Sequence, residues 1–318
     1  MQVRFKAEWE EQRMVQLTWP HADTDWGESE EMLRDAKDNF TRIAREIAET
    51  EMVLVVTPES DNVLKELEAA GVNMRNIIAA NIPSNDTWAR DHGGITVETP
   101  EGDVILDFCF NGWGMKFAAD KDNLITSRLY EEGFFGQTQV ANCRNIVMEG
   151  GSLETDGKGT LLTTSRCLLS ANRNDAYSKE EIEEVLRQLL GVEKIMWLDY
   201  GGIEGDDTDG HIDTLARLTP DGSILYQELH DEMMNKQLQS FGRKTIALPY
   251  IENDGLPRTY ANYLITNDKV LVPTYNLPTD DEALRIVAEA FPARKVVGVD
   301  CCTLVKWHGS LHCVTMQY

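Results

Sequence analysis

The sequence lacks any long apolar run. No segment approaches the roughly 18 consecutive apolar residues that a membrane-spanning helix needs, and residues 1–12 contain no apolar core of a signal peptide. We therefore expect a cytoplasmic protein with no membrane partner. The chain also lacks Pro- or Ser-rich linkers and low-complexity tracts, which favours one folded unit over two tethered domains.

Positive charge is scarce. The 318 residues include 30 Lys and Arg against 54 Asp and Glu, which gives a net charge of −24. Such a field repels phosphate backbones and anionic lipids and attracts small cations. We therefore expect no nucleic acid partner. Taken alone, the charge indicates no more than a well-solvated acidic surface.

Disulfide and zinc patterns are absent as well. The sequence has no C-x-x-C pair and no His at zinc-ribbon spacing, so we expect reduced thiols. Most free cysteines pack as small apolar residues, and a catalytic role needs a specific neighbourhood. We expect Cys109, Cys167, Cys301 and Cys302 to be core strand residues, whereas Cys313 stands on an alternating stretch that predicts a final strand.

Helices and strands alternate along the chain. Apolar residues at helical spacing predict three helices, and a β-rich run follows each of them. The helices are expected at 30–50, 179–190 and 281–291, and the strands that follow at 52–58, 194–199 and 295–300. Further strands are predicted at 104–110, 159–164, 223–229 and 269–275. This alternation predicts an α/β fold, with modules of roughly 60 residues.

Four polar, Gly-rich segments lie between these elements, where α/β proteins usually assemble their sites. They span residues 85–94, 149–160, 205–214 and 309–313. In the third, His211 and Asp213 stand two apart, and we expect them on one face of a strand. An acidic turn that happens to contain a His is the alternative. A calcium loop is excluded, because its first and twelfth positions would lack carboxylates.

The other segments have plain structural interpretations. In 85–94, Asp91 can pair with Arg90 or cap a turn. In 149–160, the glycines predict a turn and hairpin with positive φ, which would leave Glu149 exposed. This segment lacks the lysine of a phosphate loop. Cys313 and His211 would make a nucleophile and a base if they met.

The motifs resemble those of a known family. WARD (88–91), EGGS (149–152), DDTDGHID (206–213) and GSLHC (309–313), in this order, closely resemble the agmatine deiminases and bacterial peptidylarginine deiminases of the guanidine-modifying superfamily. The stretches 6–20, 111–114, 168–174 and 296–300 are also similar, so the likeness covers essentially the whole chain. It implies a five-bladed α/β propeller (pentein), in which ββαβ-like modules surround a central channel. Residues 1–318 would form this single catalytic domain, and the protein would be a homo-oligomer.

The resemblance also implies roles for individual residues. The catalytic set would be Cys313 as nucleophile, His211 as general acid/base, Glu149 as its orienting partner, and Asp91 and Asp213 as guanidinium-binding carboxylates. Trp88, Asp86 and Gly150 would join Asp91 and Asp213 in binding the substrate. No metal or organic cofactor is expected. The chain departs from the family at 306–308, where Lys, Trp and His replace a run of glycines and affect recognition of the substrate tail.

The function that the resemblance implies is hydrolysis of agmatine to N-carbamoylputrescine and ammonia, which feeds putrescine synthesis. The reaction would pass through an S-alkylthiouronium intermediate on Cys313. A charge of −24 suits agmatine, a dication. One alternative is a peptidylarginine or free-arginine deiminase. From other classes, the alternatives are a metal-dependent hydrolase with ligands among His211, Asp213, Asp91, His92 and His312, and a guanidine-binding protein without catalysis.

Overall fold

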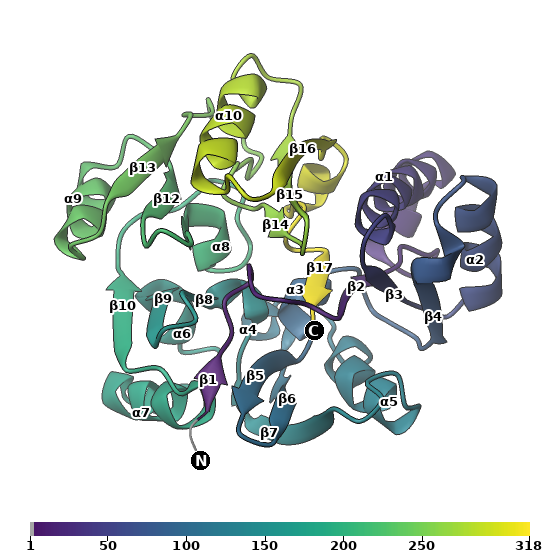
Figure 1. The fold of residues 1–318 in the computed structure, drawn as a ribbon, viewed down its shortest axis with the longest axis horizontal. Helices are drawn as coiled ribbons and strands as arrows, with labels where there is room; N and C mark the ends of the chain where they lie inside the picture. The colour runs from purple at the N-terminus through teal and green to yellow at the C-terminus, as the bar shows by residue number, and fades with distance from the viewer. Residues whose placement is uncertain (1–2) are drawn as a thin grey trace.

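The computed structural model describes residues 3–318, so the first two residues of the predicted domain lie outside it. The described chain is a mixed α/β fold with five β-sheets (Figure 1). Their strand orders are β17-β2-β3-β4, β1-β5-β6-β7, β8-β9-β10, β11-β12-β13 and β14-β15-β16. The strands are β1 Arg4–Phe5, β2 Met14–Thr18, β3 Met52–Thr57, β4 Ile77–Asn81, β5 Ile95–Thr99, β6 Gly102–Cys109, β7 Gln139–Val147, β8 Glu154–Thr155, β9 Thr160–Thr164, β10 Lys194–Leu198, β11 Ala216–Leu218, β12 Ile224–Gln227, β13 Thr245–Leu248, β14 Leu264–Ile265, β15 Lys269–Thr274, β16 Lys295–Asp300 and β17 Thr315–Gln317.

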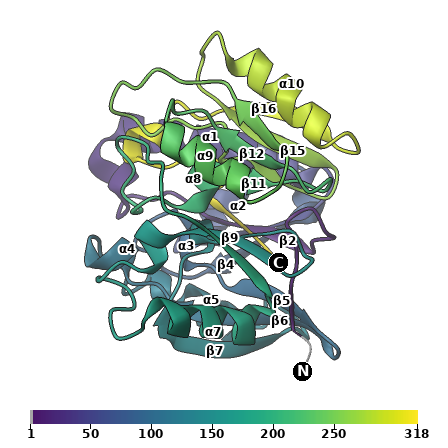
Figure 2. The ribbon, with the colours of Figure 1, turned by 90° about the vertical axis from the view of Figure 1, so that its left-hand side faces the viewer.

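Helices connect the parallel strands of these sheets. The α-helices are α1 Glu30–Ala48, α2 Ser60–Ala69, α3 Ala89–His92, α4 Gly112–Met115, α5 Ile125–Glu131, α6 Ser165–Leu168, α7 Lys179–Leu190, α8 Ile212–Leu215, α9 Glu232–Ser240 and α10 Asp280–Ala290. Short 3-10 turns are η1 Asp25–Glu28, η2 Met74–Asn76, η3 Asp122–Leu124, η4 Gly150–Ser152 and η5 Leu304–Trp307. Figure 2 shows α5 and α7 at one end of the molecule and α10 at the other.

All five sheets share one pairing pattern. In each, an antiparallel pair adjoins a parallel pair, as in β14-β15 followed by β15-β16. Parallel neighbours need a long crossover, and helices such as α10 supply it. The predicted helices at 30–50, 179–190 and 281–291 are confirmed as α1, α7 and α10. The predicted strand at 223–229 is shorter, because β12 ends at Gln227.

The helix ends follow from local side-chain chemistry. Ser178 and Glu181 form a reciprocal capping box at the start of α7, and Gly191 ends the helix with φ of 67°. At the start of α1, the hydroxyl of Ser29 accepts the N–H of Met32. These caps satisfy backbone groups that a helix end otherwise leaves unpaired.

The last strand pairs with a strand from near the start of the chain. β17 pairs antiparallel with β2, with Thr315 opposite Leu17, and Figure 1 shows the C-terminus near the middle of the ribbon. Cys313 precedes this strand by two residues, so the prediction that it stands on the final strand is wrong. Because β17 is anchored by the ladder, the turn that carries Cys313 has a fixed position.

A buried arginine joins four segments of the fold. Arg217 of β11 is fully buried and donates to Glu154 from Nε at 2.8 Å and to Glu8 from Nη2 at 2.9 Å. Its Nη1 donates to the carbonyl of Tyr263 at 2.7 Å. A buried ion pair contributes little net stability, but removing one partner leaves an uncompensated charge inside the protein.

We expect Arg217→Met to lower the free energy of unfolding by about 3–5 kcal/mol, because the carboxylates of Glu8 and Glu154 lose their counter-charge. Urea denaturation followed by circular dichroism measures the change. Arg187→Met is the matched control, since Arg187 makes an exposed pair with Glu183 and its loss should cost less than about 1 kcal/mol. Similar losses in both variants would contradict this prediction.

Candidate active site

A cavity of about 200 Å³ contains the Cys313 thiol. Aromatic side chains and carboxylates form most of its wall. The aromatic residues are Trp88, Trp113, Phe117 and Trp307, and the acidic ones are Asp25, Asp86, Asp91 and Asp207. Thr208, His308 and Gly309 complete the lining, which among residues 3–318 includes no Lys or Arg. The cavity therefore fits a flat, cationic ligand.

An asparagine holds the turn that carries Cys313. Asn262 Oδ1 accepts the backbone N–H of His312 at 2.9 Å and lies 3.4 Å from Cys313 Sγ. Burial raises the pKa of the Cys313 thiol well above its ordinary value, and the charges of Asp213 and Asp91 raise it further. The resting residue is therefore a thiol rather than a thiolate at neutral pH.

His211 and Asp213 lie on a helical turn, so the predicted strand is wrong. Gly210, with φ of 86°, turns the chain, and Asp206 Oδ2 accepts its N–H at 2.7 Å. His211 is the extended residue directly before α8, and Asp213 belongs to the first turn of that helix. The acidic turn thus exists, yet it still brings an imidazole and a carboxylate to one place.

Gly151 marks the point where these groups meet. A Cβ atom at this position would lie 2.4 Å from His211 Nδ1, 2.8 Å from Asp91 Oδ1 and 3.2 Å from Asp213 Oδ2. Two buried atoms here, His211 Nδ1 and Asp213 Oδ1, have no hydrogen-bond partner among the described residues. A donor-rich ligand could satisfy the free carboxylate oxygen.

The glycines of 149–160 differ from expectation at one end. Gly157 and Gly159 have the predicted positive φ, but Gly150 and Gly151 do not. They form η4, where side chains are excluded by contact rather than by φ, since a Cβ on Gly150 would lie 2.2 Å from the carbonyl oxygen of Arg90. Gly150 does not line the cavity that contains Cys313.

Glu149 is fully buried, so the prediction that it is exposed is wrong. Its carboxylate accepts Arg173 Nε at 2.8 Å and lies 3.3 Å from His211 Nε2. Burial alone would raise the pKa of Glu149, but the contacts with His211 and Arg173 lower it. Cys167 lies on helix α6, and its Sγ donates to the same carboxylate at 3.5 Å. Cys167 is therefore neither a strand residue nor a simple core filler.

The same acids act on the imidazole of His211. Burial alone lowers the pKa of His211, but the charge of Asp91 and the contacts with Cys167 and Glu149 raise it well above the ordinary value. His211 Nδ1 lies 3.5 Å from Asp91 Oδ1. The ring is therefore protonated at neutral pH and can donate a proton.

Asp91 is held by neutral donors. Its Oδ2 accepts Trp113 Nε1 at 2.9 Å and its Oδ1 accepts the N–H of Gly151 at 3.0 Å. The predicted pairing with Arg90 is absent, because the Arg90 guanidinium donates instead to His312 O and Met316 Sδ. Burial raises the pKa of Asp91, and the nearby charge of His211 opposes this shift.

Asp86 and Trp88 lie together at the cavity wall. Trp88 Nε1 donates to Asp86 Oδ2 at 2.9 Å, and a Cβ on Gly309 would lie 2.1 Å from the Trp88 ring. Burial and the nearby charge of Asp25 raise the pKa of Asp86 to about 7. The outer part of the cavity therefore gains negative charge as the pH passes neutrality.

The residues that lie close enough together to hold a metal ion differ from those that the sequence suggested. Among the described residues, Glu149, Cys167 and His211 offer ligand atoms within 4.8 Å of one another. The Glu149 carboxylate already binds the Arg173 guanidinium, and this positive charge would repel a metal ion. His92 contacts Thr18 and His312 bridges two carboxylates. This donor set does not fit a metal centre.

Sequence reasoning missed four residues of this site. Asn262 was detectable only as a lone amide in an apolar run, and Arg173 lies in a segment that the resemblance covered without a role. Trp113 lies in the stretch 111–114, which the resemblance also covered without a role, and His312 was named only as a possible metal ligand. Their partners Asp91 and Asp213 are distant in the sequence.

Known proteins of one family match nearly the whole chain. The model of the Porphyromonas-type peptidyl-arginine deiminase family matches residues 4–318. The chain belongs to this family. Its relatives include the "Putative agmatine deiminase" of Shewanella sp. (strain MR-4), which is 31% identical over 98% of this chain and 92% of its own.

Solved structures of family members superpose closely. The "Putative Arginine Deiminase" from Porphyromonas gingivalis is 44% identical with a TM-score of 0.89, covering 99% of this chain and 98% of its own. A cysteine-to-serine variant of C. jejuni agmatine deiminase with substrate bound is 32% identical with a TM-score of 0.90, covering 99% and 96%. Dimethylarginine dimethylaminohydrolase from Pseudomonas aeruginosa, at 13% identity and a TM-score of 0.56 over 97% and 100%, shares the fold alone.

We expect Asp213→Asn to lower the pKa of Cys313, because the substitution removes a negative charge that opposes the thiolate. A decrease of one unit would raise the rate of alkylation by iodoacetamide at pH 8 up to about tenfold. Mass spectrometry of the Cys313 peptide measures the rate, with the Cys302 peptide as internal control. A slower or unchanged rate at Cys313 would count against the assigned electrostatics.

Proposed function

We propose that the protein is an agmatine deiminase, a hydrolase of linear amidines that converts agmatine to N-carbamoylputrescine and ammonia. The cavity supports this most directly, since a thiol lies in it beside carboxylates and aromatic rings, and its lining has no cationic side chain. The names of the Shewanella and C. jejuni relatives agree with the proposal. Its product would supply putrescine synthesis.

The architecture in this proposal is a five-bladed α/β propeller. The five sheets with one shared pairing pattern support it, as does the fold similarity to dimethylarginine dimethylaminohydrolase. Residues 1–318 would then form one catalytic unit around a channel. Assembly into a homo-oligomer and a cytoplasmic location belong to the same proposal.

Binding comes first in the proposed reaction. A guanidinium is planar and resonance-stabilised, so its carbon is a poor electrophile and must be held rigidly. Asp91 and Asp213 would each accept paired N–H groups, and Trp88 would pack along the substrate. Asp213 Oδ1, buried and without a partner, is available for such a bond.

The chemistry would then proceed in two halves. Once its proton has passed to solvent, the Cys313 thiolate attacks the guanidinium carbon, and the tetrahedral adduct collapses as His211 donates a proton to the departing ammonia. The S-alkylthiouronium intermediate remains on Cys313. His211 next takes a proton from water, which attacks the same carbon, and a second collapse releases the ureido product and the thiol. Glu149 would keep the His211 ring oriented.

The substrate would help to activate its nucleophile. Cys313 has a raised pKa in the empty site because it faces carboxylates. A bound cation and the protonated His211 counter those charges, which lowers the pKa of the thiol and favours the thiolate. An alkylation experiment with and without a non-reactive amidine tests this step. No metal or organic cofactor takes part in the proposed reaction.

The acidic outer cavity separates agmatine from arginine. The far end of agmatine is an ammonium group, which Asp25, Asp86 and Asp207 would attract, whereas the carboxylate of free arginine would be repelled. His308, with φ of 65°, places its Nδ1 2.6 Å from Gly205 O, so the residues that replace the family's glycines border this region. The alternative is deimination of free arginine, which the name of the P. gingivalis relative suggests, or of peptidyl arginine, which the description of the family suggests.

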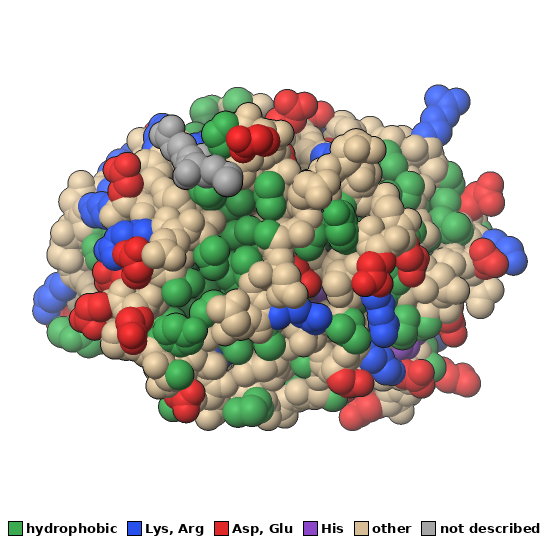
Figure 3. Space-filling view, turned by 90° about the horizontal axis from the view of Figure 1, so that it is seen from below, with side chains coloured by type: hydrophobic (Ala, Val, Ile, Leu, Met, Phe, Trp, Pro, Cys, Tyr) green, Lys and Arg blue, Asp and Glu red, His purple; other side chains and the backbone are tan. Residues whose placement is uncertain are grey.

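Partners in this proposal are small cations. On the face shown in Figure 3, acidic and basic side chains are interspersed and no large basic patch is visible, which fits the absence of a nucleic acid partner. A search of the described residues found no helix with the length and apolar character to cross a membrane.

We expect ammonia release from agmatine to exceed that from free arginine and from a peptidyl-arginine substrate. Cys313→Ala should lower the rate by at least about 10⁴-fold, because the nucleophile is lost, and a chelator should not change it. Coupled ammonia assays on the two proteins decide the matter. Faster release from either arginine substrate would refute the agmatine assignment, and strong inhibition by the chelator would favour the metal hydrolase.

We expect the KM for agmatine to fall about fivefold between pH 6 and pH 8. The Asp86 carboxyl, with a pKa of about 7, is neutral below this range and attracts the ammonium group only above it. Steady-state kinetics on Asp86→Asn should show a high KM with little of this pH dependence. Asp120→Asn, an exposed control outside the cavity, should keep the wild-type profile.

A further inference from the structure

A histidine lies between the binding carboxylates and the N-terminal segment. The His312 ring is buried, with Nδ1 2.7 Å from Asp213 Oδ2 and Nε2 2.7 Å from Glu8 Oε2. Both distances are short hydrogen bonds between a ring nitrogen and a carboxylate oxygen. Each contact requires a proton, because two acceptors do not approach so closely without one.

The positions of these two protons follow from the pairing. A neutral imidazole carries one N–H and an imidazolium carries two. Burial alone would raise the pKa of both carboxyls. Apart from His312 itself, the charge of Arg217 lowers the pKa of Glu8, and the charges of His211 and Arg217 lower that of Asp213. Both carboxylates are therefore ionised, which leaves the two protons on the ring.

We propose that His312 is held as an imidazolium between Asp213 and Glu8 and serves as a positioning residue for Asp213. The contact fixes Asp213 Oδ2 and supplies a counter-charge, while Oδ1 stays without a protein partner. The other oxygen is thereby kept for the guanidinium, so this inference rests on the proposed function. The role is separate from those of the nucleophile and the acid/base.

Two cationic side chains also lie near the ring. Arg217 Nη2 lies 3.4 Å from His312 Nε2, and the Arg90 guanidinium approaches the backbone carbonyl of His312 at 3.4 Å. Arg217 is already paired with Glu8 and Glu154. At 2.7 Å, the carboxylates of Asp213 and Glu8 are the closest charged groups to the ring.

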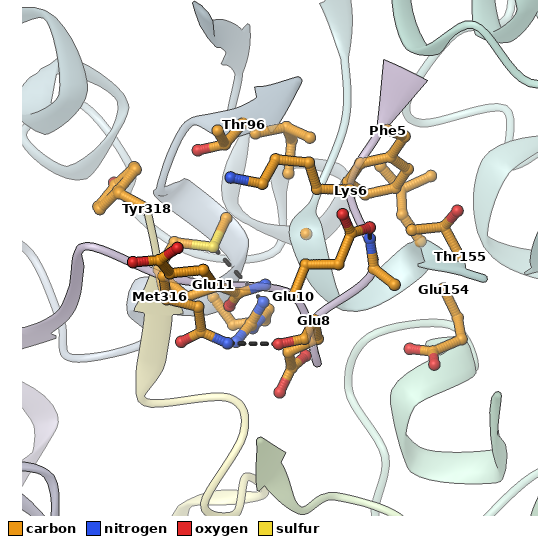
Figure 4. A pocket seen from close by; sticks show the side chains of 17 residues that line it. Phe5, Lys6, Glu8, Glu10, Glu11, Thr96, Glu154, Thr155, Met316 and Tyr318 are labelled. Carbon is orange, nitrogen blue, oxygen red and sulfur yellow. Dashed lines mark hydrogen bonds between the residues drawn. The ribbon is translucent and has the colours of Figure 1, made fainter. Parts of the chain in front are cut away.

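Glu8 also connects His312 to strand β14. Its second oxygen accepts the N–H of Ile265 at 2.7 Å. Figure 4 shows Glu8 among the side chains of a second cavity of about 50 Å³, which also includes Glu154 and Met316. The pair Glu8–His312 thus makes a residue near the start of the chain part of the proposed active site.

Two substitutions at one position separate the two ends of the bridge. The amide nitrogen of His312→Asn can take the place of Nδ1 and donate to Asp213, whereas that of His312→Gln reaches toward Glu8. We expect kcat/KM to fall roughly ten- to hundredfold in the Gln variant, the range typical when the partner of an active-site ligand is lost. The Asn variant should retain about tenfold more activity.

His21→Gln is the matched control, because His21 is another buried histidine whose ring contacts Ser84 Oγ and the N–H of Asp23 rather than a carboxylate. Its kcat/KM should stay within about twofold of wild type. Equal losses in the Asn and Gln variants of His312 would indicate a merely structural role and overturn the proposal.

Glu8→Gln tests the protonation state. The substitution replaces the carboxylate that faces Nε2 with a neutral amide of the same size, so the NMR signal of Nε2 should change while that of Nδ1, which faces Asp213, remains. NMR of protein with ¹⁵N-labelled histidine should show both His312 ring nitrogens protonated at neutral pH, assigned by loss of the signals in His312→Asn. A single protonated nitrogen would refute the imidazolium. If wild type shows no deiminase activity, the proposed function fails, while the NMR result still decides the state of His312.

Discussion

Carboxylates that are buried and yet charged are the constraint on which this structure depends. A charge inside a protein is costly unless paired or hydrogen-bonded, and a cation-binding site needs several of one sign. Each acid has a partner inside the protein: Arg173 for Glu149, His312 for Asp213, the Trp113 indole for Asp91, and Arg217, which is shared, for Glu8 and Glu154. Among the described residues, Asp213 alone of these five acids keeps a buried carboxylate oxygen, Oδ1, without a hydrogen-bond partner.

The partners come from segments that the sequence keeps far apart. Arg217 lies on β11, Glu8 in the N-terminal segment and His312 before β17, and together they form one buried network. Stability and site electrostatics therefore rest on the same contacts. A substitution in this network changes both, whereas one in an exposed pair such as Arg187–Glu183 changes neither by much.

Periodic features of the fold could be predicted from the sequence, because burial imposes them locally. Helices α1, α7 and α10 and strands β3, β9, β15 and β16 follow the apolar spacing closely. The turn at His211 could not be predicted, because the two-residue spacing of His211 and Asp213 is the same whether or not Gly210 turns the chain. The resemblance located the acids and the thiol near one another, as Gly151 and the cavity lining illustrate.

Contacts between residues far apart in the sequence could not be predicted, for a different reason. Asn262 holds the Cys313 turn and Arg173 binds Glu149 through contacts that leave no periodic trace in the sequence. Gly150 and Gly151 were noticed for the wrong reason, because contact with neighbouring atoms rather than φ excludes a side chain there. Such constraints appear only once the tertiary structure is known.

The pairing of β17 with β2 has a consequence for biosynthesis. Tyr318 bonds Gln16, a residue 302 positions earlier, so the ladder closes only after the last described residues have left the ribosome. Upstream sheets can form during translation, since domains fold as synthesis proceeds. The Cys313 thiol, which lies two residues before β17, therefore reaches its neighbouring carboxylates after the upstream sheets have formed.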